Sequence, residues 1–374
     1  MSRPVILTSE ADFDGSAWYM LPLFRHWPTE EPCPVVGIFG RSISSLGEEL
    51  LRIRPDCPVV TLKSTRLLHD WRQFQERILD AYKPMLIHAI GLIATRVIHL
   101  HTVIPYLRVT PRPRINVSDT DMPGSGLLGW WTRRATRHAN RVLSWSSAET
   151  QRYRDQGVVA ESINYLPPPA EPPRVELDRA LLLQELGLPP GTRLIMTAGR
   201  FVAESELKTA IWAFDVVKYT DPRLALVLIG QGPDQERLER FGQAVGYDDY
   251  RIRFCKPTVD LAGMFALADL VWVTHRRGGI RETLAAMAAG RPILAVHNAE
   301  LRDLIRDGET GRFVPAGDRV ALAALSSEWL GQPETGIRIG TAAKSFAMTN
   351  FSAKSFVERL RSLYYDMLGS FSAD

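Results

Sequence analysis

Short apolar runs rich in β-branched residues recur along the whole chain, and stretches with helical periodicity separate them. Each run is almost continuously apolar, which is typical of parallel strands buried on both faces of a sheet. This alternation of strand and helix predicts an α/β fold with doubly wound parallel sheets. The predicted strands are Val5–Thr8, Val35–Phe39, Val59–Leu62, Met85–Ala89, Ile115–Ser118, Val142–Trp145, Ile163–Leu166, Leu194–Ala198, Leu224–Ile229, Ile252–Phe254, Leu270–Val273, Ile293–Val296 and Arg312–Val314.

A proline-rich segment interrupts the alternation near the middle of the chain. Leu166–Arg174 reads LPPPAEPPR, which excludes a helix or a central strand. The segment is either a surface loop or a linker between domains, and the renewed alternation after it favours the linker. We therefore expect one domain over 1–168 and a second over 175–350. The last predicted helix, Ser352–Leu368, has no strand after it, so we expect 351–374 to pack back on the first domain.

Composition and charge exclude several classes of protein. The 374 residues are 45% hydrophobic and 23% charged, as in ordinary globular proteins, and 45 basic against 42 acidic residues give a net charge of +3. This weak charge predicts no nucleic-acid partner. Three widely separated cysteines fit no metal spacing and no disulfide framework, which favours the cytoplasm. We find neither a signal-peptide pattern nor an apolar span of ~20 residues, so we expect at most peripheral membrane contact.

Glycine-containing turns follow several predicted strands of the second half. Gly199–Arg200 and Gly230–Gly232 each end a strand, where glycine lets backbone N–H groups approach a ligand. Gly278–Gly279 opens a predicted helix over 280–289. Alone, each turn is a weak signal, because strand-to-helix turns use glycine routinely.

Three arginines crowd the start of that helix. Cations there oppose the helix dipole and repel one another, and a docked anion would relieve the conflict. The alternative is that all three side chains are simply solvated. The three are Arg276, Arg277 and Arg281.

Taken in order, these segments resemble the retaining nucleotide-sugar glycosyltransferases of group 1, which have the GT-B fold. The matching residues are Gly199–Arg200, Gly230, Gly232–Pro233, Ala268–Asp269, Leu284, Ala286–Met287–Ala288, Gly290, Pro292, Gly308, Thr310–Gly311 and Asp318. The resemblance is specific over about 194–320. It is weaker in the first half, where Asp14–Ala17, Ile87–Gly91 and Arg141–Ser146 look like family segments. It implies two Rossmann-like domains facing a cleft, with the C-terminal helix crossing back to the first domain.

The chain departs from the family at its charged positions. The family's two motif glutamates correspond to Arg277 and Ala285, and its phosphate-binding lysine corresponds to Ser205, with Glu206 in place of a glycine. We expect Arg277 to compensate for the missing lysine. Glu282 lies nearly one helical turn before Ala285, so we expect it to replace the lost ribose-binding carboxylate.

The resemblance implies a set of site residues without a metal ion or cofactor. The implied catalytic residues are His88, Arg200 and Arg277; the donor-binding residues are Gly15, Gly199, Gly230, Gly278, Gly279, Arg281 and Glu282; the acceptor-binding residues are Asp119 and Trp130. Two of these have plain structural alternatives. His88 is equally consistent with a packing residue at a strand end, and Asp119 with the cap of a turn.

The implied activity is metal-independent transfer of a sugar, with retention, from a nucleotide-diphosphate-sugar to a glycan or lipid-linked acceptor. The missing glutamates leave two alternatives: a catalytically degenerate GT-B scaffold that binds nucleotide, glycan or protein, and an enzyme with another phosphorylated donor. Leu127–Trp145 combines four arginines and three tryptophans with no acidic residue, which is typical of helices that lie on a membrane. The alternative is that its tryptophans pack inside the protein.

Overall fold

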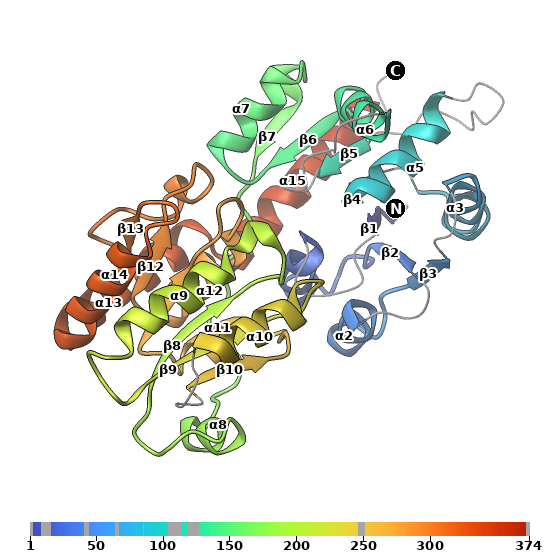
Figure 1. Cartoon of the computed structure of the whole chain (residues 1–374). Helices are drawn as coiled ribbons and strands as arrows, with labels where there is room; N and C mark the ends of the chain where they lie inside the picture. Colours follow the sequence, from blue (N-terminus) through green and yellow to red (C-terminus); the bar gives the residue numbers. More distant parts are fainter. Residues whose placement is uncertain are drawn as a thin grey trace. The chain divides into compact units, whose positions relative to one another are not determined.

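The computed structural model describes residues 3–8, 16–40, 45–63, 67–84, 86–103, 114–117, 127–245 and 251–371. The chain forms two compact units, shown in Figure 1. Unit 1 comprises Met1–Pro168 together with Ala353–Asp374, and unit 2 comprises Pro169–Ser352. All thirteen predicted strands are present in these units, most of them within one or two residues of the predicted bounds.

Unit 1 is built on a seven-stranded parallel sheet. Its strand order is β3-β2-β1-β4-β5-β6-β7, and every pairing in it is parallel. The order reverses between β1 and β4, as in a doubly wound Rossmann-like domain. The strands are β1 (Val5–Thr8), β2 (Val35–Gly40), β3 (Val59–Lys63), β4 (Ile87–Ile90), β5 (Arg114–Val117), β6 (Arg141–Ser144) and β7 (Ile163–Tyr165).

Helices connect these strands, and a long terminal helix joins them from the far end of the sequence. They are η1 (Ser16–Tyr19), α1 (Met20–Arg25), α2 (Ser45–Ile53), α3 (Leu67–Phe74), the π-helical turn η2 (Gln75–Leu79), α4 (Asp80–Tyr82), α5 (Leu92–Val103), α6 (Leu127–Arg137), α7 (Ser147–Asp155), η4 (Ala160–Ser162) and α15 (Ala353–Phe371). Within unit 1, α15 packs against α1. Phe356 stacks edge-on with Tyr19 at 5.6 Å between ring centroids, and Arg361 pairs with Glu31. The last helix therefore returns to the first unit, as expected for a helix with no strand after it.

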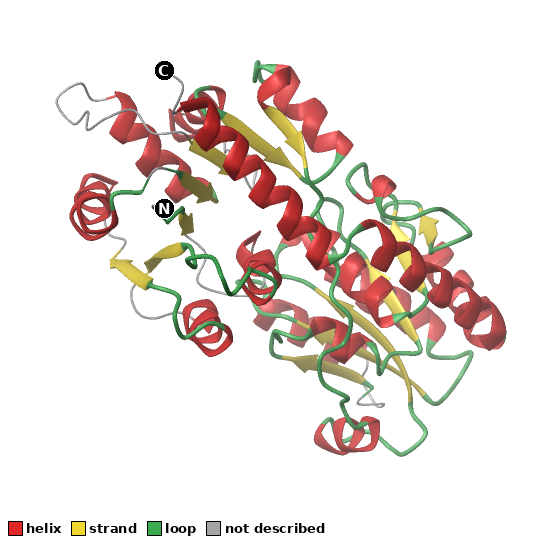
Figure 2. Ribbon diagram, turned by 180° about the vertical axis from the view of Figure 1, so that it is seen from behind, coloured by secondary structure: helices red, strands yellow, loops and turns green. Residues whose placement is uncertain are grey.

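Unit 2 is built on a six-stranded parallel sheet with the order β10-β9-β8-β11-β12-β13. Its strands are β8 (Arg193–Ala198), β9 (Leu224–Ile229), β10 (Ile252–Cys255), β11 (Leu270–Val273), β12 (Ile293–Val296) and β13 (Arg312–Val314). The order reverses between β8 and β11, so the crossover helices on the two sides of this point cover opposite faces. Helices lie in front of these strands in Figure 1 and again, from behind, in Figure 2.

The helices of unit 2 form two packed groups. One group joins α9 to α10 and α13, and the other joins α12 to α11 and α14. The helices are α8 (Arg179–Glu185), η5 (Ala203–Ser205), α9 (Leu207–Val217), α10 (Gln235–Val245), α11 (Leu261–Phe265), α12 (Ile280–Ala289), η6 (Leu301–Asp303), α13 (Arg319–Gly331) and α14 (Pro333–Asn350).

The proline-rich segment lies beside the place where the chain returns. Ala170 forms a parallel bridge with Ser352, and its N–H donates to the Phe351 carbonyl at 2.7 Å. The two crossings of the chain between the units are thus adjacent in space. A sequence pattern could show only the first of them.

One buried polar pair stands within the apolar core of unit 2. The indole of Trp272 on β11 is fully buried, and its N–H donates to the hydroxyl of Ser326 on α13 at 2.9 Å. Ser326 is also fully buried and donates to the Leu322 carbonyl at 2.6 Å. This pair ties the centre of the sheet to α13.

We predict that Ser326→Ala lowers the free energy of unfolding by about 1–3 kcal/mol, because it leaves the buried Trp272 N–H without an acceptor. Urea denaturation of the full chain measures the change. The neighbouring Ser327 is half-buried and bonds to Thr220 and the Ala323 carbonyl, so Ser327→Ala should change stability by about 0.5 kcal/mol or less. Equal effects of the two substitutions would contradict the role assigned to the pair.

Candidate functional site

The candidate site lies at the carboxyl edge of the unit 2 sheet, where β8 and β11 are neighbours and the strand order reverses. Ligands of doubly wound sheets bind outside the carboxyl ends of the strands at such a switch point. The glycine turns at 199–200, 230–232 and 278–279 each follow a strand of this sheet at this edge. The topology therefore brings those separate turns to one place.

Glycines allow the strand-end loops to approach one another closely. Gly199 has φ +148° and Gly230 has φ +157°. A Cβ atom at Gly230 would collide with the Gly199 carbonyl oxygen, and one at Gly199 would lie 2.5 Å from Nε2 of His275. Any other residue at these two positions would push apart the ends of β8, β9 and β11.

Hydrogen bonds join the loop after β8 to the turn after β11. Thr274 donates through Oγ1 to the Ser205 carbonyl at 2.8 Å, and the Arg276 N–H donates to the Glu204 carbonyl at 2.9 Å. Ser205 is buried, and its hydroxyl donates to the Arg200 carbonyl at 2.6 Å. Ser205 therefore shapes the loop after β8 through its own hydrogen bond.

Glu206 takes a backbone conformation that is usual for glycine and rare for other residues. Its φ of +51° and ψ of +30° lie in the left-handed region, which costs a non-glycine residue roughly 1–2 kcal/mol. Its carboxylate accepts from Thr209 Oγ1 at 2.9 Å and pairs with the Arg276 guanidinium. Arg276 thus has an anionic partner within the protein.

A side-chain clamp from the end of β12 holds the turn that opens α12. Asn298 donates to the carbonyls of His275, at 2.9 Å, and Gly278, at 3.3 Å, and it accepts from the N–H groups of Glu300 and Leu301 at 3.0 Å. Asn298 and Glu300 are both buried. The two loops that follow β11 and β12 therefore move as one.

The expected role of the Gly278 N–H needs correction. We expected this group to be open to a diphosphate, but it donates to Oε2 of Glu300 at 2.5 Å. The glycine turn before α12 therefore already holds a carboxylate from the chain itself. Asn298 and Glu300 were missed because they lie two and four residues after β12, and only the pairing of β12 with β11 brings them to this turn.

The three arginines at this turn differ in their interaction partners. Arg276 pairs with Glu206, and Arg281 donates to the Thr258 carbonyl at 2.9 Å. Arg277 is exposed and makes no hydrogen bond or ion pair with the residues that the structure describes. Crowding by the arginines is thus relieved for Arg276 and Arg281 without a bound ligand.

Three further side chains at this edge lack partners within the described part of the chain. Arg200 is exposed and makes no side-chain hydrogen bond, and Glu282 is 6% exposed and makes neither a hydrogen bond nor an ion pair there. Nδ1 of the buried His275 also has no hydrogen-bond partner among those residues. Together with Arg277, this edge therefore has two cations, one carboxylate and one imidazole nitrogen without a hydrogen-bond partner in the described residues.

His88 lies apart from these groups, in the middle of the unit 1 sheet. It is fully buried on β4, where Nδ1 lies 2.6 Å from the Tyr364 hydroxyl and Nε2 lies 3.3 Å from the Tyr19 hydroxyl. A direct contact between His88 and an acceptor would require one of these hydrogen bonds to open. Burial lowers the pKa of His88 to about 3, so the imidazole is neutral at physiological pH.

The remaining site residues implied by the resemblance lie on α6 or outside the described residues. Gly15 and Asp119 lie outside the residues that the structure describes. Trp130 lies on α6 with 51% of its surface exposed, and the Arg134 guanidinium lies 5.6 Å from its ring centroid. In the described ranges we find no cluster of three or more His, Cys, Asp or Glu side chains suited to a metal ion.

The second half of the chain is similar to a known protein family. Residues 178–346 match the family described as Glycosyl transferases group 1. N-acetyl-alpha-D-glucosaminyl L-malate synthase of Bacillus anthracis is 22% identical over 192 residues, which cover 51% of this chain and 50% of that protein. A GDP-mannose-dependent alpha-(1-6)-phosphatidylinositol monomannoside mannosyltransferase of Mycolicibacterium smegmatis is 25% identical over 245 residues, 62% of this chain and 63% of that protein. The chain thus spans between about half and under two thirds of the length of these curated relatives.

Solved structures show the fold of the whole chain. Anabaena HepE, in complex with UDP and glucose, superposes with a TM-score of 0.82 at 18% identity and covers 98% of this chain and 100% of its own. Sucrose-phosphate synthase from Thermosynechococcus elongatus gives a TM-score of 0.77 at 18% identity over 98% of this chain and 100% of its own. These likenesses confirm the predicted GT-B fold.

We predict that His88 makes the stability of unit 1 depend on pH. An unfolded chain protonates this histidine near pH 6.5, whereas the folded unit does so only near pH 3. The free energy of unfolding should therefore fall as the pH falls from about 6.5, by about 1.4 kcal/mol for each pH unit. Urea denaturation at several pH values from 7.5 to 5 measures the slope.

The substitution His88→Gln should remove this part of the slope whatever its effect on stability at pH 7.5. His69 is exposed, so His69→Gln serves as the control and should retain the slope. An unchanged slope in His88→Gln would show that the folded protein protonates His88 readily.

Proposed function

We propose, on the premise that this chain carries a group-1 glycosyltransferase domain in a GT-B fold, that it transfers a sugar from a nucleotide-sugar donor to an acceptor. The family match over 178–346 carries this proposal. Two structural neighbours are described in complex with UDP or UDP-glucose, which supports a uracil nucleotide as the first donor to test. Nothing in these comparisons favours a degenerate scaffold.

The donor diphosphate is proposed to bind at the carboxyl edge of unit 2. A nucleoside diphosphate carries two to three negative charges, and a helix N-terminus supplies only about half a positive charge. Arg200 and Arg277 are exposed cations without partners in the described residues, so they supply the remaining charge. Because Glu300 occupies the Gly278 N–H, the two arginines have a larger share of diphosphate binding than the glycine turn.

The nucleoside is proposed to contact Glu282. This side chain is 94% buried on the first turn of α12 and lacks a partner in the described chain. A buried carboxylate without a partner is unfavourable unless a ligand supplies hydrogen-bond donors. The two hydroxyls of a ribose are suitable donors.

In the proposed reaction the bond between the anomeric carbon and the leaving phosphate breaks, and a bond to the acceptor oxygen forms on the same face of the sugar. The acceptor proton passes to the departing phosphate oxygen. Arg200 and Arg277 stabilise the charge that develops on the diphosphate, a role that a metal ion would otherwise fill. The reaction therefore retains the anomeric configuration and needs no metal ion.

An assay of nucleotide release tests the proposed function without knowledge of the acceptor. UDP-glucose and GDP-mannose are incubated with the full chain and candidate glycan or lipid-linked acceptors, with and without EDTA. We expect release of one nucleoside diphosphate that EDTA does not abolish, and a product with the donor's anomeric configuration by NMR. Nucleotide binding without any transfer would instead identify a nucleotide-binding scaffold.

We predict that Arg277→Ala weakens binding of the accepted nucleoside diphosphate about tenfold, since charge-assisted hydrogen bonds are worth ~1.5–3 kcal/mol and exposure reduces that value. Arg276→Ala is the matched control, because Arg276 lies on the same turn but pairs with Glu206. Glu282→Gln should weaken the ribonucleotide more than its 2′-deoxy analogue. Calorimetry measures the nucleotide affinity of all three variants. Unchanged affinity in both Arg277→Ala and Glu282→Gln would refute this placement of the nucleotide.

A lipid-linked acceptor would place the protein at a membrane surface, and α6 offers a suitable face. Leu127 and Trp130 are 76% and 51% exposed, and Arg134 and Arg137 on the same helix are also exposed. Exposed apolar and cationic side chains together favour an anionic bilayer. No helix in the described part of the chain is long and apolar enough to cross a membrane.

We predict that the full chain floats with vesicles containing phosphatidylglycerol, but not with pure phosphatidylcholine, and that salt weakens this binding. Trp130→Ala and Arg134→Ala should each reduce the floating fraction several-fold. Tyr219→Ala removes an equally prominent aromatic group from unit 2, with 77% exposure, and should have no effect. Equal binding of wild type and the two α6 variants would exclude this face.

A further inference from the structure

A pocket lies at the amino edge of the unit 2 sheet, at the opposite end of the strands from the candidate site. Its volume is about 440 Å³. The starts of β8 and β11, the turn before β12, the ends of α12 and α13, and α14 from Pro333 to Lys344 form its walls. Neither the sequence motifs nor the proposed transfer reaction assigns a role to this edge.

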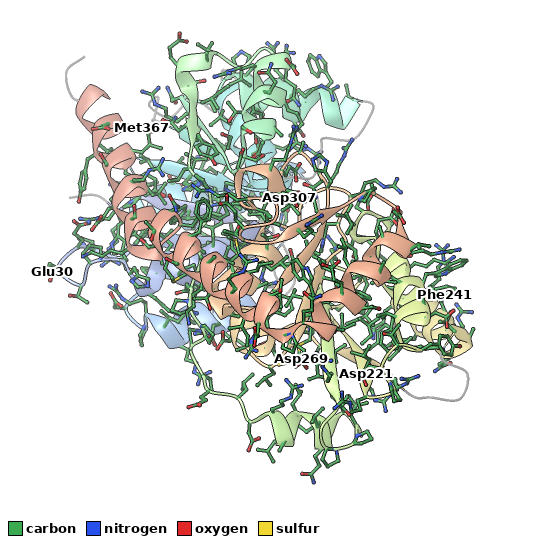
Figure 3. All side chains as sticks on the ribbon, turned by 90° about the vertical axis from the view of Figure 1, so that its left-hand side faces the viewer. Glu30, Asp221, Phe241, Asp269, Asp307 and Met367 are labelled. Carbon is green, nitrogen blue, oxygen red and sulfur yellow. The ribbon has the colours of Figure 1, made fainter. Side chains whose placement is uncertain are left out.

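The carboxylates around this pocket already have cationic partners. Asp269 accepts from Arg179 at 2.6 Å, and Asp221, just outside the lining, accepts from Arg223 at 3.0 Å and Arg193 at 3.3 Å. These arginines lower the pKa of Asp221 to about 2, so it stays ionised. Figure 3 labels both carboxylates on unit 2. Burial lowers the pKa of Arg291 and Asp269 partly offsets that effect, although the two side chains form no ion pair.

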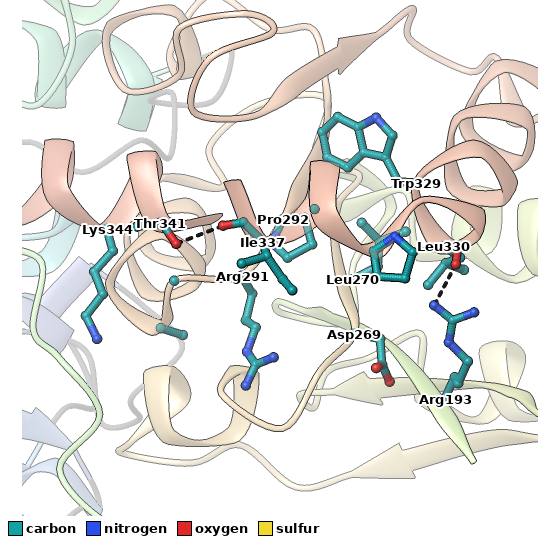
Figure 4. A pocket seen from close by; sticks show the side chains of 14 residues that line it. Arg193, Asp269, Leu270, Arg291, Pro292, Trp329, Leu330, Ile337, Thr341 and Lys344 are labelled. Carbon is teal, nitrogen blue, oxygen red and sulfur yellow. Dashed lines mark hydrogen bonds between the residues drawn. The ribbon is translucent and has the colours of Figure 1, made fainter. Parts of the chain in front are cut away.

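Two cations of the lining lack such a partner. Arg291 is half-buried and donates to the Ala266 carbonyl, and no carboxylate lies within ion-pair distance of it in the described residues. Lys344 makes no hydrogen bond or ion pair within the same ranges. The end of α12 offers only about half a negative charge. Figure 4 shows both charged ends directed to the same side of the pocket.

An apolar surface adjoins these cations. Ile337, Thr341 and Lys344 are spaced to share one face of α14, and Ile337 is 67% exposed. Gly336 leaves room beside Pro292, because a Cβ atom there would lie 3.4 Å from the proline ring. The lining therefore combines positive charge with an exposed apolar wall.

We propose that this pocket binds a phosphate ester, with its anion between Arg291 and Lys344 and its apolar part on Ile337. The ester is either a soluble phosphorylated metabolite or the headgroup of a phosphorylated lipid. The cavity holds a ligand of small-molecule size. This site does not depend on the proposed transfer reaction, because none of its lining residues lies at the carboxyl edge.

Calorimetry of the full chain with phenyl phosphate and inorganic phosphate tests the proposal. We expect phenyl phosphate to bind more tightly, since its ring covers Ile337. Lys344→Ala should weaken both probes about three- to tenfold, and Ile337→Ser should weaken phenyl phosphate alone. Arg338→Ala is the matched control, because Arg338 is exposed on α14 but does not line the pocket.

A vesicle-binding experiment distinguishes a lipid headgroup from a soluble phosphate ester. Binding of vesicles containing phosphatidic acid that is lost in Lys344→Ala supports a lipid headgroup, and retained binding of phenyl phosphate alone supports a soluble ester. Phosphate binding that is unchanged by Lys344→Ala overturns the proposal. So does binding that Arg277→Ala abolishes, because the phosphate would then lie at the carboxyl edge.

Discussion

The close approach of backbone segments at the carboxyl edge of unit 2 governs the rest of the candidate site. At the ends of β8 and β9 the backbone of Gly230 approaches the Gly199 carbonyl, and Gly199 leaves room for the His275 imidazole, which follows β11. Hydrogen bonds from Thr274 and Asn298 then fix the loops that follow β8, β11 and β12 to one another. The charged side chains of this edge thus project from a rigid frame.

The charged side chains of this edge are of two kinds, those with a partner inside the protein and those without one in the described residues. Arg276 and Glu206 pair with each other, and the Glu300 carboxylate accepts from the Gly278 N–H just before α12. Arg200, Arg277 and Glu282 make no comparable contacts within the described residues. A folded protein rarely buries a carboxylate without a partner, so Glu282 is the side chain that most strongly suggests a ligand at this edge.

The likeness to group-1 glycosyltransferases over 178–346 and the geometry of this edge are independent observations. Glu206 adopts the left-handed conformation, and the Ser205 hydroxyl donates to the Arg200 carbonyl within the same loop. Glu300, which no motif suggested, accepts from the Gly278 N–H. The TM-score of 0.82 at 18% identity shows that the fold is shared although most residues differ.

The sequence by itself determined the strands, the glycine turns and the return of the last helix, because periodicity and glycine chemistry act over a few residues. Only the tertiary structure decided which side chains meet. The contact of Glu300 with Gly278 spans 22 residues, and that of His88 with Tyr364 spans 276. The order of strands in the sheet brings Glu300 to Gly278, and the packing of α15 on unit 1 brings Tyr364 to His88. Local patterns carry no information about such pairings, since they arise only when separate elements pack together.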